Sequence, residues 1–130
     1  AYHNLGLVYV EIENIDLAKK NFLLAIKINP LFIYSYINLG ILFQNEGQKE
    51  KAIECFEKTI EIDPKNISGY NNLGLVNASL GKYKKALKNY LKTLKILIHC
   101  LLKQFLKTEM KKMNMAKNCQ RKLEKLWRKL

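Results

Sequence analysis

The sequence predicts an all-α protein, an α-solenoid of three stacked helical hairpins followed by one long basic helix. Two observations carry this prediction. The same pattern of residues returns every 34 positions without a gap. Within each unit, apolar residues recur at steps of three or four, which is the spacing of one face of a helix. Such hairpins bury their apolar faces only against their neighbours, so they are stable as a stack.

The repeat is defined by short signatures that align in all three units. Asn-Leu-Gly occurs at 4–6, 38–40 and 72–74. The other aligned positions are Tyr2, Tyr36 and Tyr70; Ala18, Ala52 and Ala86; Phe22, Phe56 and Tyr90; and Pro30 with Pro64. This spacing resembles the tetratricopeptide repeat over residues 1 to about 96. The resemblance implies a right-handed superhelix of three repeats (1–32, 33–66 and 67–96), with the first helices lining a concave face, and a C-terminal helical extension over 97–130.

The turn between the two helices of a unit is predicted at Gly47 and Gly81, because glycine adopts a left-handed backbone without steric cost. The first unit has Glu13 and Asn14 in this place. Asparagine tolerates that conformation next best, so we expect Asn14 to adopt it.

The second helix of a unit is predicted to end at Asn29-Pro30 and at Asp63-Pro64, since proline lacks a donor and clashes with the preceding turn. Gly6 and its equivalents lie inside the first helix, where glycine costs about 1 kcal/mol relative to alanine. This indicates close approach of a neighbouring helix. We expect Ala18 and its equivalents to supply the matching small surface, with Phe22 and its equivalents as large side chains of the same packing.

The third unit lacks the closing proline, and the 49 residues after Gly81 contain neither Gly nor Pro. We therefore expect its second helix to continue past Ile96 as an amphipathic helix. Its apolar side carries Leu102, Leu106, Met110, Met113, Ala116, Leu123, Trp127 and Leu130. Its opposite side carries Lys103, Lys107, Lys111, Asn118, Arg121, Lys125 and Lys129.

The formal net charge of +12 is unevenly distributed. Residues 1–64 hold six Lys against nine Asp or Glu, whereas residues 65–130 hold 17 Lys or Arg against two Glu.

Four interpretations of the basic tail remain open: a cap on the last repeat, a docking helix for an acidic protein, an electrostatic anchor to an anionic membrane or nucleic acid, and an out-of-frame extension. The last rests on assumed codons: if Leu97-Ile98-His99 is TTA-ATC-CAY, a shift of one base gives Asn-Pro, the missing signature.

The exposed side of the first helices is the predicted binding site. In the family's geometry, Asn4, Asn38 and Asn72 form a ladder of amides that can grip the backbone of an extended peptide. The peptide-binding residues expected in this groove are Asn4, Leu7, Tyr34, Ile37, Asn38, Ile41, Asn45, Asn71, Asn72 and Leu75. The alternative is that these asparagines cap or cross-link helices within the solenoid.

Family resemblance suggests two more specific functions, and the residues disfavour one of them. The Asn-Leu-Gly signature resembles the repeat arm of O-linked N-acetylglucosamine transferase, so the chain could be the substrate-recognition part of such a glycosyltransferase. Repeats that capture the acidic tail of heat-shock chaperones use a carboxylate clamp of Lys, Arg and Asn. That clamp would need Lys at His3 and Ser68, Arg at Asn72 and Asn at Leu7, and only Asn38 matches, which disfavours chaperone-tail capture.

The sequence offers no constellation for catalysis: it has no HExxH, no glycine-rich phosphate loop and no Ser/His/Asp arrangement. We therefore predict a non-catalytic protein–protein interaction scaffold without cofactor or metal.

Three cysteines without a CxxC pair favour a reducing, cytoplasmic setting, and we expect Cys55 and Cys100 to be buried. The apolar stretch Ile96–Leu102 is too short to span a membrane. Because the chain begins inside a first helix, we expect it to be part of a longer repeat array or to have lost its beginning.

Overall fold

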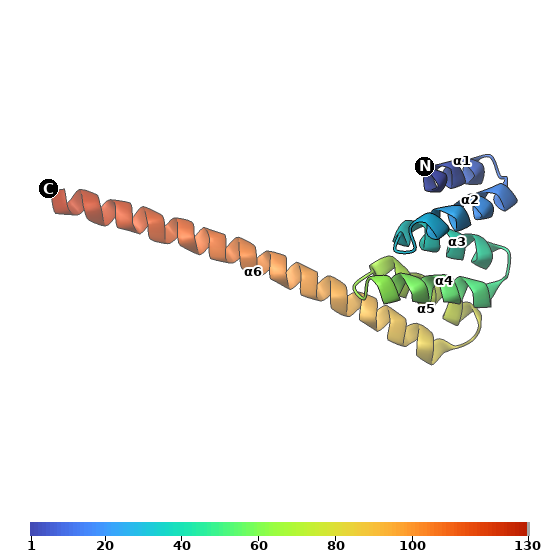
Figure 1. Ribbon diagram of the computed structural model, residues 1–130. Coiled ribbons are helices and arrows are strands. Elements are labelled where there is room, and N and C mark those ends of the chain that lie inside the picture. The colour runs from blue at the N-terminus through green and yellow to red at the C-terminus, as the bar shows by residue number, and fades with distance from the viewer. Residues whose placement is uncertain (130) are drawn as a thin grey trace. The chain divides into compact units, whose positions relative to one another are not determined.

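The computed structural model describes residues 1–129, which form six α-helices and no strand (Figure 1). The chain divides into two units, residues 1–94 and the residues from 95 onward. The helices are α1 (Tyr2–Glu11), α2 (Ile15–Ile28), α3 (Ile33–Asn45), α4 (Lys49–Ile62), α5 (Ile67–Ser79) and α6 (Tyr83–Lys129).

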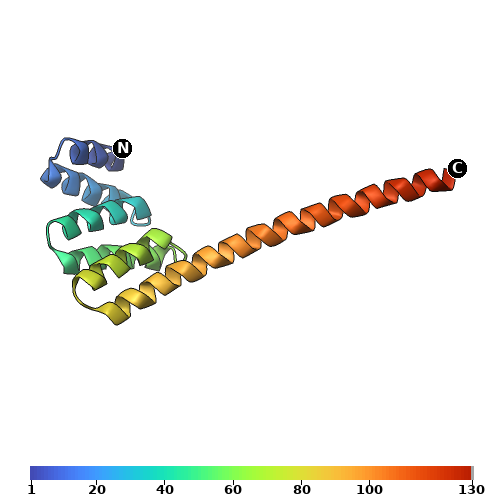
Figure 2. The ribbon, with the colours of Figure 1, turned by 180° about the vertical axis from the view of Figure 1, so that it is seen from behind.

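The first unit is a stack of helical hairpins, as the 34-residue period predicts. Helix α1 packs on α2 and α3 packs on α4, and each hairpin contacts the next through α2 with α3 and α4 with α5 (Figure 2). The start of α6 completes the third hairpin against α5, where Tyr90 lies against Gly74. The all-α solenoid predicted from the sequence is therefore the observed fold.

Close helix approach within each hairpin occurs at the recurring glycine. A β-carbon added to Gly6 would stand 2.6 Å from Cε1 of Phe22. The same contact recurs between Gly40 and Phe56 and between Gly74 and Tyr90. The nearest neighbour of the glycine is thus the aromatic ring, which the sequence analysis placed in the same packing as a large side chain.

The aligned alanines and aromatics of the first two units lie in two buried clusters, one for each junction between hairpins. The first contains Ala18, Phe22, Leu39, Leu42 and Cys55. The second contains Ala52, Phe56, Leu73 and Val76. The ring of Phe43 contacts both clusters, so it joins the two junctions into one continuous core.

The turns within the hairpins correct one prediction. Gly47 and Gly81 have positive φ, 78° and 72°, as expected. In the first hairpin, however, Glu13 has φ 58°, whereas Asn14 has φ −89°. Asn14 instead caps α2, because its side chain accepts a hydrogen bond from the Leu17 amide at 3.3 Å.

Helices α2 and α4 end just before Pro30 and Pro64, where the sequence predicts their ends. The preceding residues, Asn29 and Asp63, have extended backbones and accept a hydrogen bond from the amide two residues on. The proline carbonyls are held by two of the aligned tyrosines: Tyr36 donates to Pro30 and Tyr70 to Pro64, both at 3.1 Å.

Helix α6 continues far beyond Ile96, as predicted from the absence of Gly and Pro. Every residue from 97 to 129 is exposed. Cys100 lies in this stretch, so the prediction that it is buried is wrong, because no apolar neighbour covers that part of the helix. Cys55, in contrast, is buried in the first core cluster.

Candidate functional site

The residues predicted to bind a peptide lie on the first helices of the hairpins, α1, α3 and α5. Helices α3 and α5 contact each other, and α1 is tied to α3 by a hydrogen bond between Nδ1 of His3 and Oγ of Ser35 at 3.0 Å. Of the predicted residues, Ile37, Asn38 and Asn72 are half-buried, and Asn4, Leu7, Tyr34, Ile41, Asn45, Asn71 and Leu75 are exposed. We call these ten residues the first-helix face.

The first helices are nearly free of charge. Apart from Glu11, α1, α3 and α5 contain no Asp, Glu, Lys or Arg. The charged residues of the first two hairpins are concentrated on the second helices, α2 and α4. A ligand on the first-helix face therefore meets amides and apolar side chains rather than ions.

The three aligned asparagines of the first-helix face keep hydrogen-bonding capacity. The Nδ2 of Asn38 donates to the Tyr34 carbonyl, one turn back in the same helix, at 3.0 Å. Within residues 1–129, the side chains of Asn4 and Asn72 make no intramolecular hydrogen bond. In contrast, Asn21 and Asn77 are buried and bonded within their own helices, at 2.8 Å each.

An aromatic cluster at one end of the first-helix face joins α1 to the start of α3. The ring centroid of His3 lies 4.9 Å from that of Phe32, in an edge-to-face arrangement, and 6.5 Å from that of Tyr34. Burial of the imidazole, with a smaller effect of the amino group of Ala1, lowers the pKa of His3. A hollow of about 360 Å³ opens beside it, lined by Ala1, Tyr2, His3, Asn4, Ala25, Ile28, Asn29 and Phe32.

Sequence reasoning missed Phe32 as a site residue because it precedes α3 and belongs to no helical face. The available signal was its position two residues after Pro30 and directly before α3, because proline restricts the backbone there. The same reasoning missed a lysine-rich hollow of about 520 Å³ on the second-helix side. Its lining is Asp16, Lys19, Lys20, Leu23, Leu24, Lys27, Phe43 and Lys51.

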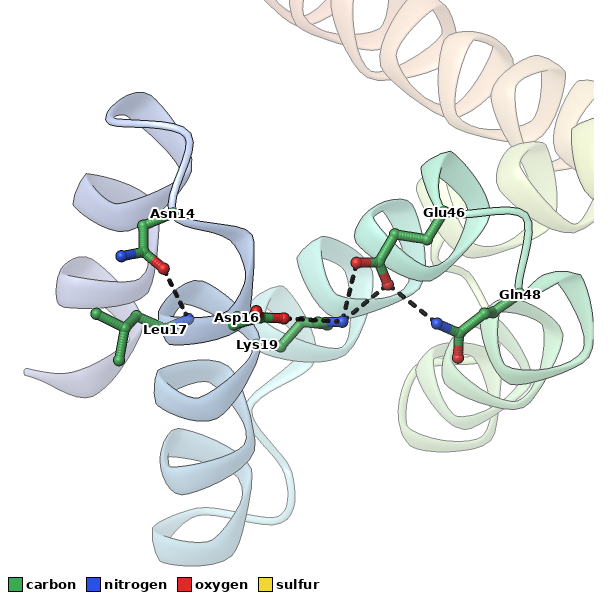
Figure 3. A network of polar contacts seen from close by, with 6 residues as sticks. All are labelled: Asn14, Asp16, Leu17, Lys19, Glu46 and Gln48. Atoms are coloured by element: carbon green, nitrogen blue, oxygen red, sulfur yellow. Dashed lines mark hydrogen bonds and ion pairs between the residues drawn. The ribbon is translucent and has the colours of Figure 1, made fainter.

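Two residues that line the lysine-rich hollow, Asp16 and Lys19, belong to a polar network (Figure 3). The Nζ of Lys19 donates to both carboxylate oxygens of Glu46, at 2.9 and 2.8 Å, and lies 3.7 Å from Asp16. Gln48 donates to the same carboxylate at 3.1 Å. The hydrogen bond to Glu46 is the main cause that raises the pKa of Lys19. The network links α2 to the turn between α3 and α4.

The predicted contact residues of the basic tail are all exposed on α6: Lys103, Lys107, Lys111, Arg121, Lys125 and Lys129. Large apolar side chains of the same segment are exposed too, up to 77% for Trp127. No helix in the described part of the chain is apolar over a length that would span the bilayer. Residues 1–129 also contain no cluster of His, Cys, Asp or Glu suited to a metal ion.

Three family models described as the tetratricopeptide repeat match residues 1–30, 33–66 and 55–88, which together are more than half of the chain. No curated protein matches the chain in sequence.

Solved structures of MamA are similar to the first part of the chain. One, titled "Crystal structure of MamA", is 31% identical with a TM-score of 0.74, covering 77% of this chain and 58% of the other. A second MamA structure is 33% identical, with a TM-score of 0.69 and coverages of 73% and 52%. MamA from Desulfovibrio magneticus RS-1 is 24% identical, with a TM-score of 0.70 and coverages of 75% and 55%. The chain thus spans little more than half the length of these proteins. It belongs to the tetratricopeptide repeat family.

Proposed function

We propose that the first-helix face of this protein-interaction scaffold binds an extended, uncharged polypeptide segment of a partner protein. The observation that carries the proposal is the contrast between helices. The first helices present exposed amides and apolar side chains with a single carboxylate, Glu11, whereas the ions lie on the second helices. Repeat stacks commonly use the extended surface formed by one set of helices for recognition.

The amides of the first-helix face would hold the backbone of the bound segment. Asn4 and Asn72 have free donors and acceptors, and Asn38 uses one donor within its helix and keeps its carbonyl oxygen. A peptide backbone offers one donor and one acceptor per residue, so amides repeated along the stack match any sequence of side chains.

The apolar residues of the face would provide the selectivity. Tyr34 is 65% exposed, and Ile41 and Leu75 are exposed between the asparagines. Covering each of these side chains with an apolar group of the partner would stabilise the complex by about 1 kcal/mol or more. We therefore expect the partner segment to carry spaced aliphatic or aromatic residues.

A carboxylate-bearing tail is a poor candidate ligand for this face. Neither His3, whose pKa is lowered, nor Ser68 supplies a cation where a carboxylate clamp would need one. Charge-assisted hydrogen bonds to an anion are therefore not available on α1 and α5. The three free thiols are consistent with action in a reducing, cytoplasmic compartment, which we include in the proposal.

The proposal can be tested by selecting peptides from a random display library on the full chain. The selected peptides should carry little net charge. Their affinity, measured by fluorescence anisotropy with labelled synthetic peptide, should change little between about 0.05 and 0.5 M salt, because the face offers almost no ions to screen. The triple variant Asn4→Ala/Asn38→Ala/Asn72→Ala should bind at least about tenfold more weakly, since each lost hydrogen bond is worth roughly 0.5–1.5 kcal/mol.

A matched control removes amides elsewhere. Asn114→Ala/Asn118→Ala changes two exposed asparagines of α6, outside the face, and should bind the peptides like the unmodified chain. Circular dichroism would establish that all variants remain helical. Peptides that are acidic and lose affinity steeply with salt, or that bind the triple variant unchanged, would refute the proposal.

A further inference from the structure

The last 33 described residues of α6 present an apolar stripe that no other part of residues 1–129 covers. Leu102, Leu106, Leu123 and Leu126 are each more than half exposed, and so is Met113. An exposed stripe along seven turns or more of a helix is unusual in a solvated protein and marks an interaction surface. The question is which partner fits it.

The spacing within this stripe is that of a coiled-coil seam. Positions separated alternately by four and three residues give a period of 3.5, which keeps one line of side chains facing a partner helix. The positions are Leu102, Leu106, Glu109, Met113, Ala116, Gln120, Leu123 and Trp127. We call these eight residues the seam, and six of them are apolar.

Two polar residues interrupt the seam and restrict how it can pair. In the single chain, the Glu109 carboxylate lies 2.9 Å from Nζ of Lys112, and Gln120 donates to Glu124 at 3.3 Å. Beside Glu109 is a hollow of about 420 Å³, lined by Leu106, Glu109, Met110, Lys112, Met113 and Ala116. Such a gap between seam residues is where a side chain of a partner helix inserts.

We propose that the seam pairs with the seam of a second copy of this chain, running antiparallel, about a centre between Asn114 and Met115. In this register Glu109 faces Gln120 of the second copy, so each polar residue meets a hydrogen-bonding partner. The apolar residues also face one another. Leu102 faces Trp127 of the second copy, Leu106 faces its Leu123, and Met113 faces its Ala116, and every pair occurs twice by symmetry.

The residues beside the seam agree with this register. Lys103 faces Glu124 of the second copy, an opposite-charge pair that also occurs twice. On the other flank Phe105 faces Leu126 of the second copy, and both side chains are about 60% exposed in the single chain. No like-charged pair arises along either flank over residues 102–127.

Other pairings of the same helix are worse. In a parallel pair Glu109 would face Glu109 of the second copy within the seam, and Lys112 would lie beside Lys117. In antiparallel pairs shifted by one heptad, Glu109 would face Met113 or Trp127 and would have no polar group opposite it across the seam. A buried polar group without a partner costs about 1–3 kcal/mol, so these alternatives are disfavoured.

The charge of the segment predicts an unusual salt dependence. Residues 95–129 hold eleven Lys or Arg against two Glu. Most of these cations, including Lys107, Lys111 and Lys125, lie on the helix side away from the seam, so they repel between copies without preventing contact. Added salt screens this repulsion and should strengthen the pair. Binding of an acidic protein, a membrane or a nucleic acid through the same cations would weaken with salt.

Disulfide cross-linking tests the geometry directly. In the full chain with Cys100→Ser/Cys119→Ser, one preparation carries Lys103→Cys and another carries Glu124→Cys. Oxidation of the mixture should give a covalent dimer, because these positions face each other. Each preparation alone should give none, since the two copies of one position are roughly 35 Å apart in the antiparallel pair.

A charge exchange tests the same contact without cross-linking. By sedimentation equilibrium, Lys103→Glu should raise the dimer dissociation constant about tenfold, because it replaces two attractions by two repulsions. The exchanged variant Lys103→Glu/Glu124→Lys should restore the affinity. Lys107→Glu is the matched control: it makes the same change of charge away from the seam and should not weaken the dimer.

Several results would overturn the proposal. The first is a chain that stays monomeric up to about millimolar concentration. The second is a cross-link between two copies of the Lys103→Cys variant, which a parallel pair would allow. The third is a dimer whose dissociation constant does not change with Lys103→Glu. A monomer whose Trp127 emission shifts to the blue on vesicles of anionic phospholipid would show instead that a membrane surface covers the stripe.

Discussion

Gly40 lies directly against the ring of Phe56, so that a β-carbon at Gly40 would lie 2.6 Å from Cε1 of the ring. Phe56 is fully buried in a core cluster, so its ring cannot move out into solvent to make room. Overpacking of this kind costs about 1–3 kcal/mol, whereas alanine gains roughly 1 kcal/mol in helix propensity. We therefore predict that Gly40→Ala lowers the free energy of unfolding by up to about 2 kcal/mol.

Urea denaturation of the single and double variants would check this prediction. Phe56→Leu alone should also destabilise the chain, because it leaves a cavity. If the two residues interact as described, Gly40→Ala/Phe56→Leu should lose less than the two single losses combined. Strict additivity would contradict the proposed steric cause.

Glu13 is the second source of a testable stability change. It has φ 58° at the position where the other hairpins have Gly47 and Gly81. A left-handed backbone costs a residue with a β-carbon about 1–2 kcal/mol, and glycine avoids this cost. Glu13→Gly should therefore raise the free energy of unfolding by about 1 kcal/mol in urea denaturation. Glu13→Ala, which removes the charge but keeps the β-carbon, should give no comparable gain.

These two sites show which features of the fold could be predicted from the sequence. The 34-residue period predicted the hairpins, the turns at glycine and the close helix approach, because each depends on local backbone rules that every unit repeats. It placed Phe22 in the same packing as Gly6 but did not specify that the ring itself lies nearest the glycine, since periodicity does not give the direction of a side chain. Asn14 was misassigned because capping α2 competes with a left-handed turn, and capping prevails.

For the candidate site, the spacing in the sequence could place Asn38 and Tyr34 on one face of a helix, because residues four apart share a face. It could not place Phe32 beside His3, since that contact joins two hairpins. The lysine-rich hollow around Phe43 was missed for the same reason. Its residues come from α2, α3 and α4, and their proximity follows from packing rather than from spacing in the chain.

The ion pair of Lys19 and Glu46 should make a small, salt-sensitive contribution to stability. Their side chains are 19% and 31% exposed, so water partly screens the pair. We expect Glu46→Gln to lower the free energy of unfolding by about 0.2–1 kcal/mol at low salt, with less effect near 1 M salt. A double-mutant cycle with Lys19→Met would isolate the coupling between the two side chains. A coupling that does not decrease with salt would contradict an electrostatic origin.

The three thiols should differ sharply in reactivity. Cys100 and Cys119 are exposed on α6, whereas Cys55 lies in the core. With iodoacetamide under native conditions, mass spectrometry should find the first two alkylated rapidly. Cys55 should be alkylated only as fast as the hairpins open. In urea beyond the unfolding transition all three should react at similar rates. Rapid native labelling of Cys55 would contradict its buried position.

Cys55 also predicts how stability changes in alkali. Burial, with a smaller effect of the nearby Glu54 carboxylate, raises the pKa of its thiol from 9.0 to about 11. Below pH 9 the thiol is protonated in both states, so it adds no pH dependence. Between pH 9 and about 11 it ionises only in the unfolded chain, and the free energy of unfolding falls as the pH rises.

Other groups titrate in the same range, so the test of Cys55 must be differential. Urea denaturation from pH 8 to about 11 would compare the unmodified chain with Cys55→Ala. The alanine variant should be less stable at pH 8, because it leaves a small cavity, but should lose stability more slowly above pH 9. The gap between the two curves should therefore narrow with pH. Parallel curves would mean that the Cys55 thiol ionises equally in both states, which a buried position does not allow.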